Sequence, residues 1–136
     1  MQGVYSVTKY DEVQARTYAK DLGWNPEQEE TFIKMFGKHC GVRFETKDGK
    51  YYNITIFSDD RVAPMEIEDG KEVSDLNVVG IPVKNKLVKE PKALNVRQTM
   101  ENGKYTDISW TFKPDQMIIT MISYNHQAEY VLKKVG

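Results

Sequence analysis

Only a few residues of this chain have the types that covalent chemistry needs, and their spacing argues against it. His39 and Cys40 could form a base–nucleophile pair, but the strand expected here points neighbouring side chains to opposite faces. We therefore interpret Cys40 as a small buried hydrophobic residue. We expect His126, in a predicted turn, to face solvent. Two histidines and one cysteine also provide no zinc-type ligand spacing.

Acidic residues and glycines add no catalytic motif. The acidic clusters coincide with a predicted helix start or with predicted turns, at 27–30, 59–60 and 66–69. No glycine-rich phosphate loop or dinucleotide-binding fingerprint occurs in the sequence. We therefore expect no enzyme, no metal and no cofactor.

The last third of the chain fits a different chemistry, the binding of an apolar molecule. Residues 104–112, 116–124 and 127–135 each alternate with period two, which is typical of strands with two different faces. One face collects the larger apolar side chains, which are Ile108, Trp110, Phe112, Met117, Ile119, Met121, Ala128, Tyr130 and Leu132. Such a face suits either a filled core or the wall of an apolar cavity. Packing alone also explains the tryptophan and tyrosine rings.

Composition narrows the setting in which this chemistry takes place. The formal net charge is −1, so no overall positive field attracts nucleic acid, while transient membrane contact stays open. The 136 residues fit a single domain, which we expect to be a monomer. No apolar run is long enough for a transmembrane helix, and the N-terminus does not resemble a secretory signal. With one cysteine, these features predict a cytoplasmic protein.

Two helices are predicted near the N-terminus, after a first strand. Asp11 can cap a helix through residues 12–22, and Gly23 ends it as a C-terminal glycine. The second helix begins with Asn25 as N-cap and a proline at the first helical position. We expect it to stop near Gly37.

The other segments have the lengths and turn residues of short strands. Asp48-Gly49 is a strong hairpin turn, and the turns at 68–70 and 101–103 look similar. Together with the last three strands, the predicted strands make ten; the others are 3–9, 40–47, 50–58, 62–68, 71–77, 83–89 and 93–100. They predict an all-β fold, a ten-stranded antiparallel up-and-down barrel capped by a helix-turn-helix lid. Closure would remove exposed sheet edges, and a barrel of this size can hold a small ligand. A sandwich fits the same count.

Short segments spread over nearly the whole chain resemble the intracellular lipid-binding proteins, which include fatty-acid-binding and cellular retinoid-binding proteins. The segments that carry the resemblance are Gly3-Val4-Tyr5, Tyr10-Asp11-Glu12, Leu22-Gly23, Asp48-Gly49-Lys50, Gly70-Lys71-Glu72, Gly103-Lys104 and Lys133-Lys134-Val135. The resemblance implies the same lidded barrel, with reversible carriage of a lipid in its cavity.

The resemblance also implies where the ligand's head group lies. Relatives place it with an arginine on the eighth strand and an Arg-x-Tyr on the tenth, positions that fall here on Trp110, Tyr130 and Leu132. A buried carboxylate without these cations loses hydration and gains little in return. We therefore expect a neutral or weakly polar ligand, such as a retinoid, sterol, monoacylglycerol or pigment, oriented by Tyr130 and Trp110. The alternative is a fatty acid whose head lies near the portal, close to Lys20 or Lys34.

The predicted ligand contacts are mostly apolar or aromatic, with one amide. They are Phe32, Met35, Ile54, Ile56, Gln98, Ile108, Trp110, Ile119, Met121, Tyr130 and Leu132. Phe57 and Arg61 are predicted to form a lip of the portal, although both are also explained as exposed turn residues. Two other functions stay open: a secreted lipocalin-type carrier, and a ligand-free barrel that acts as an interaction or storage protein.

Overall fold

Ten strands and two helices form along the chain in the computed structural model, which describes residues 2–59 and 61–136. The helices are α1 (Glu12–Asp21) and α2 (Pro26–Met35). The strands are β1 (Gly3–Tyr10), β2 (Gly41–Lys47), β3 (Tyr51–Ser58), β4 (Arg61–Glu68), β5 (Glu72–Leu76), β6 (Pro82–Glu90), β7 (Ala93–Met100), β8 (Tyr105–Lys113), β9 (Gln116–Ile122) and β10 (Gln127–Lys134). The predicted elements are confirmed, with boundaries shifted by at most a few residues.

Local hydrogen bonds explain why the two helices start where the sequence predicts. The Asp11 carboxylate accepts the Gln14 backbone N–H at 3.1 Å. Asn25 and Gln28 exchange side-chain and backbone hydrogen bonds at 2.8 and 2.9 Å in a capping box. Gly23 has a φ of +80° just past α1, a conformation that glycine adopts without strain. Each helix has only ten residues, and no helix in the described ranges is long and apolar enough to span a bilayer.

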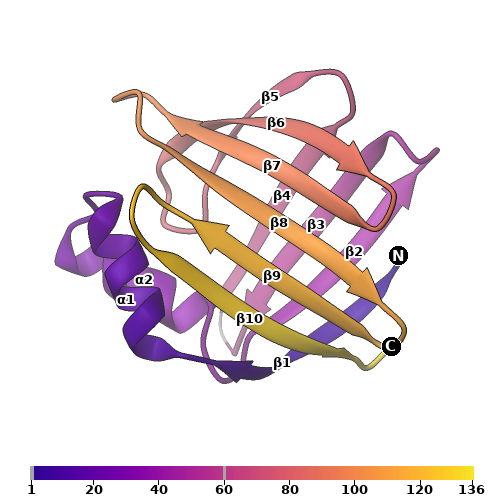
Figure 1. The fold of residues 1–136 in the computed structure, drawn as a ribbon, viewed down its shortest axis with the longest axis horizontal. Coiled ribbons are helices and arrows are strands. Elements are labelled where there is room, and N and C mark those ends of the chain that lie inside the picture. The colour runs from indigo at the N-terminus through magenta and orange to yellow at the C-terminus, as the bar shows by residue number, and fades with distance from the viewer. Residues whose placement is uncertain (1, 60) are drawn as a thin grey trace.

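The strands form one antiparallel sheet that curls into a nearly closed barrel (Figure 1). The order is β4-β3-β2-β1-β10-β9-β8-β7-β6-β5, so the first strand pairs with the last. In Figure 1 the two helices lie together across one end of the barrel, and both chain termini lie away from them. The predicted barrel with its helix-turn-helix is therefore confirmed, and the sandwich is excluded.

One predicted hairpin is wrong. The turn at 68–70 connects β4 to β5, but these strands are the two edges of the sheet and do not pair with each other. In the described part of the chain a single hydrogen bond crosses this seam, from the Glu66 backbone N–H to the Asp75 carboxylate at 3.2 Å. By contrast, Asp48 and Gly49 do join paired strands, and both have positive φ angles of 60° and 67°. The expected complete closure of the sheet is thus replaced by a side-chain bridge between two edges.

Alternating burial places the predicted apolar face inside the barrel. All nine side chains of that face are buried except Phe112, which is half-buried. Cys40 is also fully buried, whereas the His39 side chain is 62% exposed and lies 4.0 Å from Asp59. The two residues therefore do not form a reactive pair.

Candidate ligand-binding site

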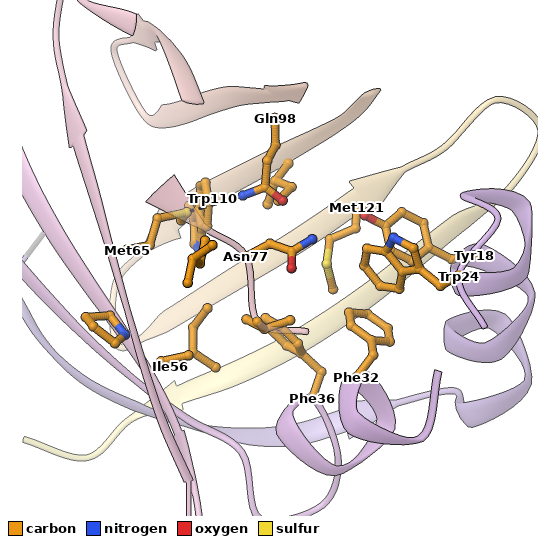
Figure 2. A pocket seen from close by; sticks show the side chains of 15 residues that line it. Tyr18, Trp24, Phe32, Phe36, Ile56, Met65, Asn77, Gln98, Trp110 and Met121 are labelled. Atoms are coloured by element: carbon orange, nitrogen blue, oxygen red, sulfur yellow. Dashed lines mark hydrogen bonds between the residues drawn. The ribbon is translucent and has the colours of Figure 1, made fainter. Parts of the chain in front are cut away.

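An apolar cavity lies between the helices and the inner face of the sheet (Figure 2). Its walls come from the two helices with their connection, six strands and the loop between β5 and β6. The lining residues are Tyr18, Trp24, Phe32, Phe36, Ile56, Ala63, Pro64, Met65, Leu76, Asn77, Val78, Gln98, Ile108, Trp110 and Met121. Aromatic and aliphatic side chains predominate, as in sites that bind small hydrophobic molecules.

The cavity is narrow in this conformation. The empty space among its side chains and at its opening amounts to about 490 Å³, but only about 30 Å³ is wide enough for the centre of a water molecule. That is room for roughly two waters, whereas pockets for small molecules usually measure about 300–1,000 Å³. A lipid can enter only if side chains move. Met65 and Met121 suit such a wall because the thioether chain adapts to different shapes.

The structure brings together about half of the predicted ligand contacts. Those that line the cavity are Phe32, Ile56, Gln98, Ile108, Trp110 and Met121. The other five are buried but lie outside the lining: Met35, Ile54, Ile119, Tyr130 and Leu132. Phe32 and Met35 lie on the buried face of α2, and the other nine lie on the inward faces of strands. Period two identifies those nine, but it does not separate cavity wall from filled core.

Tyr130 illustrates this difference. Its ring stacks on Tyr10 with a centroid distance of 5.7 Å and packs against Phe36 at 5.4 Å. Its hydroxyl is buried without a hydrogen-bond partner, and burial raises the pKa of the phenol above its usual value. The tyrosine therefore stays neutral, but it lies beside the cavity and not in its wall.

Sequence reasoning missed the other nine lining residues, among them Tyr18, Trp24, Phe36 and Asn77. Tyr18 lies on the inward face of α1 with Ala15 and Ala19, so the helical period carried a signal that could have identified it. Its hydroxyl is paired with Thr106 Oγ1 at 2.5 Å, and burial raises the pKa of this phenol. Trp24 and Asn77 lie in loops, where no periodic signal exists.

Several polar hydrogens inside the barrel have no partner. Among the described residues, the unpaired buried groups that line the cavity are Trp24 Nε1, Asn77 Nδ2 and Trp110 Nε1. All three are N–H donors. Buried N–H groups normally find an acceptor, and no described side chain or backbone group supplies one to these three.

No cation faces these donors from within the described side chains. Arg43, Arg61 and Arg97 are exposed on the outer surface. Arg16 instead pairs with three glutamates of the helices, among them Glu29 at 3.3 Å, which is the single buried charged residue in the described part. The cavity is therefore uncharged as well as apolar.

A depression on the surface meets the cavity beside α2. It shares five residues with the cavity, namely Ala63, Pro64, Leu76, Asn77 and Val78. Its outer rim includes Glu27, Thr31 and Arg61. Phe57 does not belong to either lining. Its ring lies against Gly41, where an added Cβ would come within 2.3 Å of a ring carbon.

The remaining candidates of the sequence lie apart from the cavity. Lys20 is exposed and lies 3.8 Å from Glu29, and Lys34 is exposed on α2. Burial raises the pKa of the Cys40 thiol to about 12, so it stays protonated at neutral pH. Asp60, one of the acidic pair at 59–60, lies outside the described residues. The described ranges contain no group of three His, Cys, Asp or Glu side chains placed to hold a metal ion.

The helix-turn-helix of α1 and α2, here called the lid, is hydrogen-bonded to the barrel on one side only in the described chain, and this side is called fastened. The Asp21 carboxylate, at the end of α1, accepts hydrogen bonds from Ser123 Oγ at 2.6 Å and from the Asn125 backbone N–H at 2.9 Å. His126 Nδ1 lies 3.4 Å from the same carboxylate, so this histidine contacts Asp21 as well as solvent. In the described chain, no hydrogen bond or ion pair joins α2 to β4 or to the loop after β5. The surface depression lies on that unfastened side.

Comparisons with known proteins establish the fold. No protein-family model matches the chain, and no curated protein matches its sequence significantly. Among solved structures, a fatty-acid-binding protein 1 of Echinococcus granulosus aligns with a TM-score of 0.83 at 13% identity, over 100% of this chain and 98% of that one.

Two further structures show the same likeness. The fatty-acid-binding protein from Drosophila melanogaster brain aligns with a TM-score of 0.78 at 22% identity, over 96% of this chain and 95% of that one. Caenorhabditis elegans lipid binding protein 8 aligns with a TM-score of 0.83 at 10% identity, over 98% and 94%. The structural neighbours of this chain are therefore fatty-acid-binding and lipid-binding proteins over its full length, and it has their ten-stranded, helix-capped barrel fold.

Proposed function

We propose that this protein is a non-enzymatic carrier that binds a small hydrophobic molecule inside its barrel. The observation that carries the proposal is an apolar, uncharged cavity beneath a helical lid, with three N–H groups that lack an acceptor. A fatty acid transporter is among its structural neighbours, which supports the same class of function. We place the carrier in the cytoplasm as a monomer, with no nucleic-acid partner and with transient membrane contact at most.

The head group of the ligand is proposed to be neutral or weakly polar. A buried carboxylate would leave water without meeting a cation, and this desolvation costs several kcal/mol or more. The apolar part of the ligand would supply most of the affinity, at about 25 cal/mol per Å² removed from water. Entry would proceed through the shared mouth at Ala63, Leu76 and Asn77, with the unfastened side of the lid opening transiently. A fatty acid with its head at this mouth is the charged alternative.

The first test is native mass spectrometry of the purified protein, followed by organic extraction and identification of the released molecule. We expect one hydrophobic molecule per chain, or uptake of fluorescent fatty-acid and retinoid probes by the empty protein. Ala63→Phe should reduce uptake severalfold because the added ring obstructs the mouth. Val88→Phe on the outer face, where Val88 is 56% exposed, is the matched control and should bind as the parent does.

A second candidate function rests on the small volume of the cavity. Space for about two waters favours a filled barrel that acts through its surface, as an interaction or storage protein. A protein that carries no ligand and ignores every probe, in the parent and in both variants, would support this candidate and contradict the carrier.

A further inference from the structure

The unpaired groups of the cavity are all of one hydrogen-bonding type. Trp24 Nε1 and Trp110 Nε1 are indole N–H groups, which can only donate. Asn77 could present either end of its amide, but its Oδ1 accepts the backbone N–H groups of Val79 at 3.0 Å and Ile81 at 2.9 Å. These two bonds fix the orientation of the amide and leave its Nδ2 without a partner.

The lining residues offer fewer free acceptors than free donors. Thr106 Oγ1 donates to the Ile122 carbonyl at 2.9 Å, so the Tyr18 hydroxyl donates to Thr106 Oγ1 at 2.5 Å and its oxygen is the one that can still accept. Gln98 Nε2 donates to Asn85 Oδ1 at 3.0 Å. This amide pair leaves one donor end and one acceptor end whichever way the two amides are oriented, so it adds no net preference. The cavity therefore holds a surplus of donors.

The three donors lie around one space. In Figure 2 the Asn77 amide projects into the middle of the cavity, with Trp110 on one side and Trp24 on the other. Asn77 belongs to the loop at the mouth, Trp24 belongs to the connection between α1 and α2, and Trp110 belongs to the inner face of β8. A molecule that fills this space passes within reach of N–H groups from three separate elements.

We propose that the ligand carries a polar group that accepts hydrogen bonds but has none to donate, such as the carbonyl of an ester, a ketone or an aldehyde. This inference rests on the proposed carrier function. A carbonyl oxygen satisfies the free N–H groups and brings no hydrogen of its own. A hydroxyl or amine brings a hydrogen that must reach one of the few free acceptors, the Tyr18 oxygen or the amide oxygen left by the Gln98–Asn85 pair, and a buried donor that misses them is strongly disfavoured. A carboxylate also accepts only, but it brings a charge that no described side chain in the cavity neutralises.

A matched set of ligands tests this assignment: methyl palmitate, palmityl alcohol and palmitate, which differ in the head group alone. Their affinities can be measured on the full-length protein by displacement of a fluorescent probe at neutral pH. We expect the ester to bind about tenfold more tightly than the alcohol, the equivalent of one hydrogen bond. The acid should bind more weakly than the ester.

Two substitutions locate the preference within the cavity. Asn77→Asp retains the oxygen that accepts from Val79 and Ile81 but replaces the free NH₂ with a second acceptor, so the ester should lose most of its advantage. Trp110→Phe removes an N–H while retaining a ring, and it should narrow the gap between ester and alcohol. Asn53→Asp is the control, because Asn53 lies on the outward-facing side of β3 and undergoes the same change of charge.

The outcomes separate this inference from the carrier proposal. Equal affinities, or tighter binding of the alcohol or the acid, would overturn the acceptor-only assignment and leave the carrier in place. If none of the three molecules and no probe binds, the carrier proposal fails and this inference with it. The comparison of ligands in the parent protein does not depend on whether the variants fold.

Discussion

Two buried tyrosines show that aromatic side chains inside this barrel have different roles. Tyr18 lines the cavity, and its hydroxyl is hydrogen-bonded to Thr106. The hydroxyl of Tyr130 has no partner, and its ring is held between Tyr10 and Phe36. The first hydroxyl therefore contributes to stability, whereas the second is a buried polar atom that weakens the core.

Removing each hydroxyl should have opposite effects. Tyr18→Phe leaves Thr106 without this partner and should lower the free energy of unfolding by about 1 kcal/mol. Tyr130→Phe removes an unsatisfied group, so it should leave the stability unchanged or raise it by up to about 1 kcal/mol. Urea unfolding monitored by circular dichroism measures both.

Affinity for oleate should change little with Tyr130→Phe or with salt, and a large loss in either case would reveal an anion site near Tyr130.

At the scale of elements, the lid is an asymmetric structure. Asp21 fastens the end of α1 to the turn between β9 and β10, while α2 borders the mouth. The hydrogen bond from Ser123, followed by that from the Asn125 backbone, lowers the pKa of the Asp21 carboxyl. A lowered pKa means that this carboxylate stabilises the fold above the pKa of the unfolded chain, about 3.9. That contribution is lost as the pH falls through the folded pKa.

Asp21→Asn should therefore reduce the dependence of the free energy of unfolding on pH in the acid range. The amide cannot accept from Ser123 and Asn125 as strongly as a carboxylate does, so the variant should be less stable than the parent at neutral pH and converge with it in strong acid. Stopped-flow release of a bound probe should also be faster in the variant at neutral pH. Asp59→Asn is the control, because that carboxylate is exposed and lies 4.0 Å from His39. If Asp21→Asn loses as much stability in acid as the parent does, the proposed role of the Asp21 carboxylate is contradicted.

At the scale of the whole molecule, the seam between β4 and β5 is the place where the barrel is least continuous. Every other neighbouring pair of strands forms a hydrogen-bonded ladder, whereas one hydrogen bond to Asp75 crosses this gap in the described chain. The seam also borders the mouth, because Ala63, Pro64 and Leu76 belong to β4 and β5. Opening of the barrel and entry into the cavity should therefore involve the same two strands.

Amide hydrogen exchange, followed by mass spectrometry, should reveal this order of stability. We expect fast exchange in β4, β5 and the loop 77–81, and slow exchange in β1, β9 and β10, because edge strands open locally before central ones do. Asp75→Ala should speed exchange at the Glu66 amide, while Asp69→Ala in the adjoining turn serves as control. A bound ligand should slow exchange in the loop 77–81 and in α2. Uniform exchange across all ten strands would contradict the seam as the weak point.

Local chemistry by itself determined the elements of this protein. The caps at Asp11 and Asn25, the turn at 48–49 and period-two alternation each depend on neighbouring residues, so the helices, the strands and the inward faces follow from the sequence. The absence of arginine at positions 110, 130 and 132 is likewise a property of the sequence.

Only the tertiary structure decided what surrounds those inward faces. The turn at 68–70 has the residues of a hairpin, yet its strands separate because each pairs with its other neighbour around the barrel. Trp110 and Tyr130 share the inner side of the sheet, but the first lines the cavity, whereas the pairing of β10 with β1 stacks the second on Tyr10. Asn77 reaches the cavity from a loop without periodicity. Strand pairing, curvature and cavity volume depend on contacts between distant segments, which no local pattern specifies.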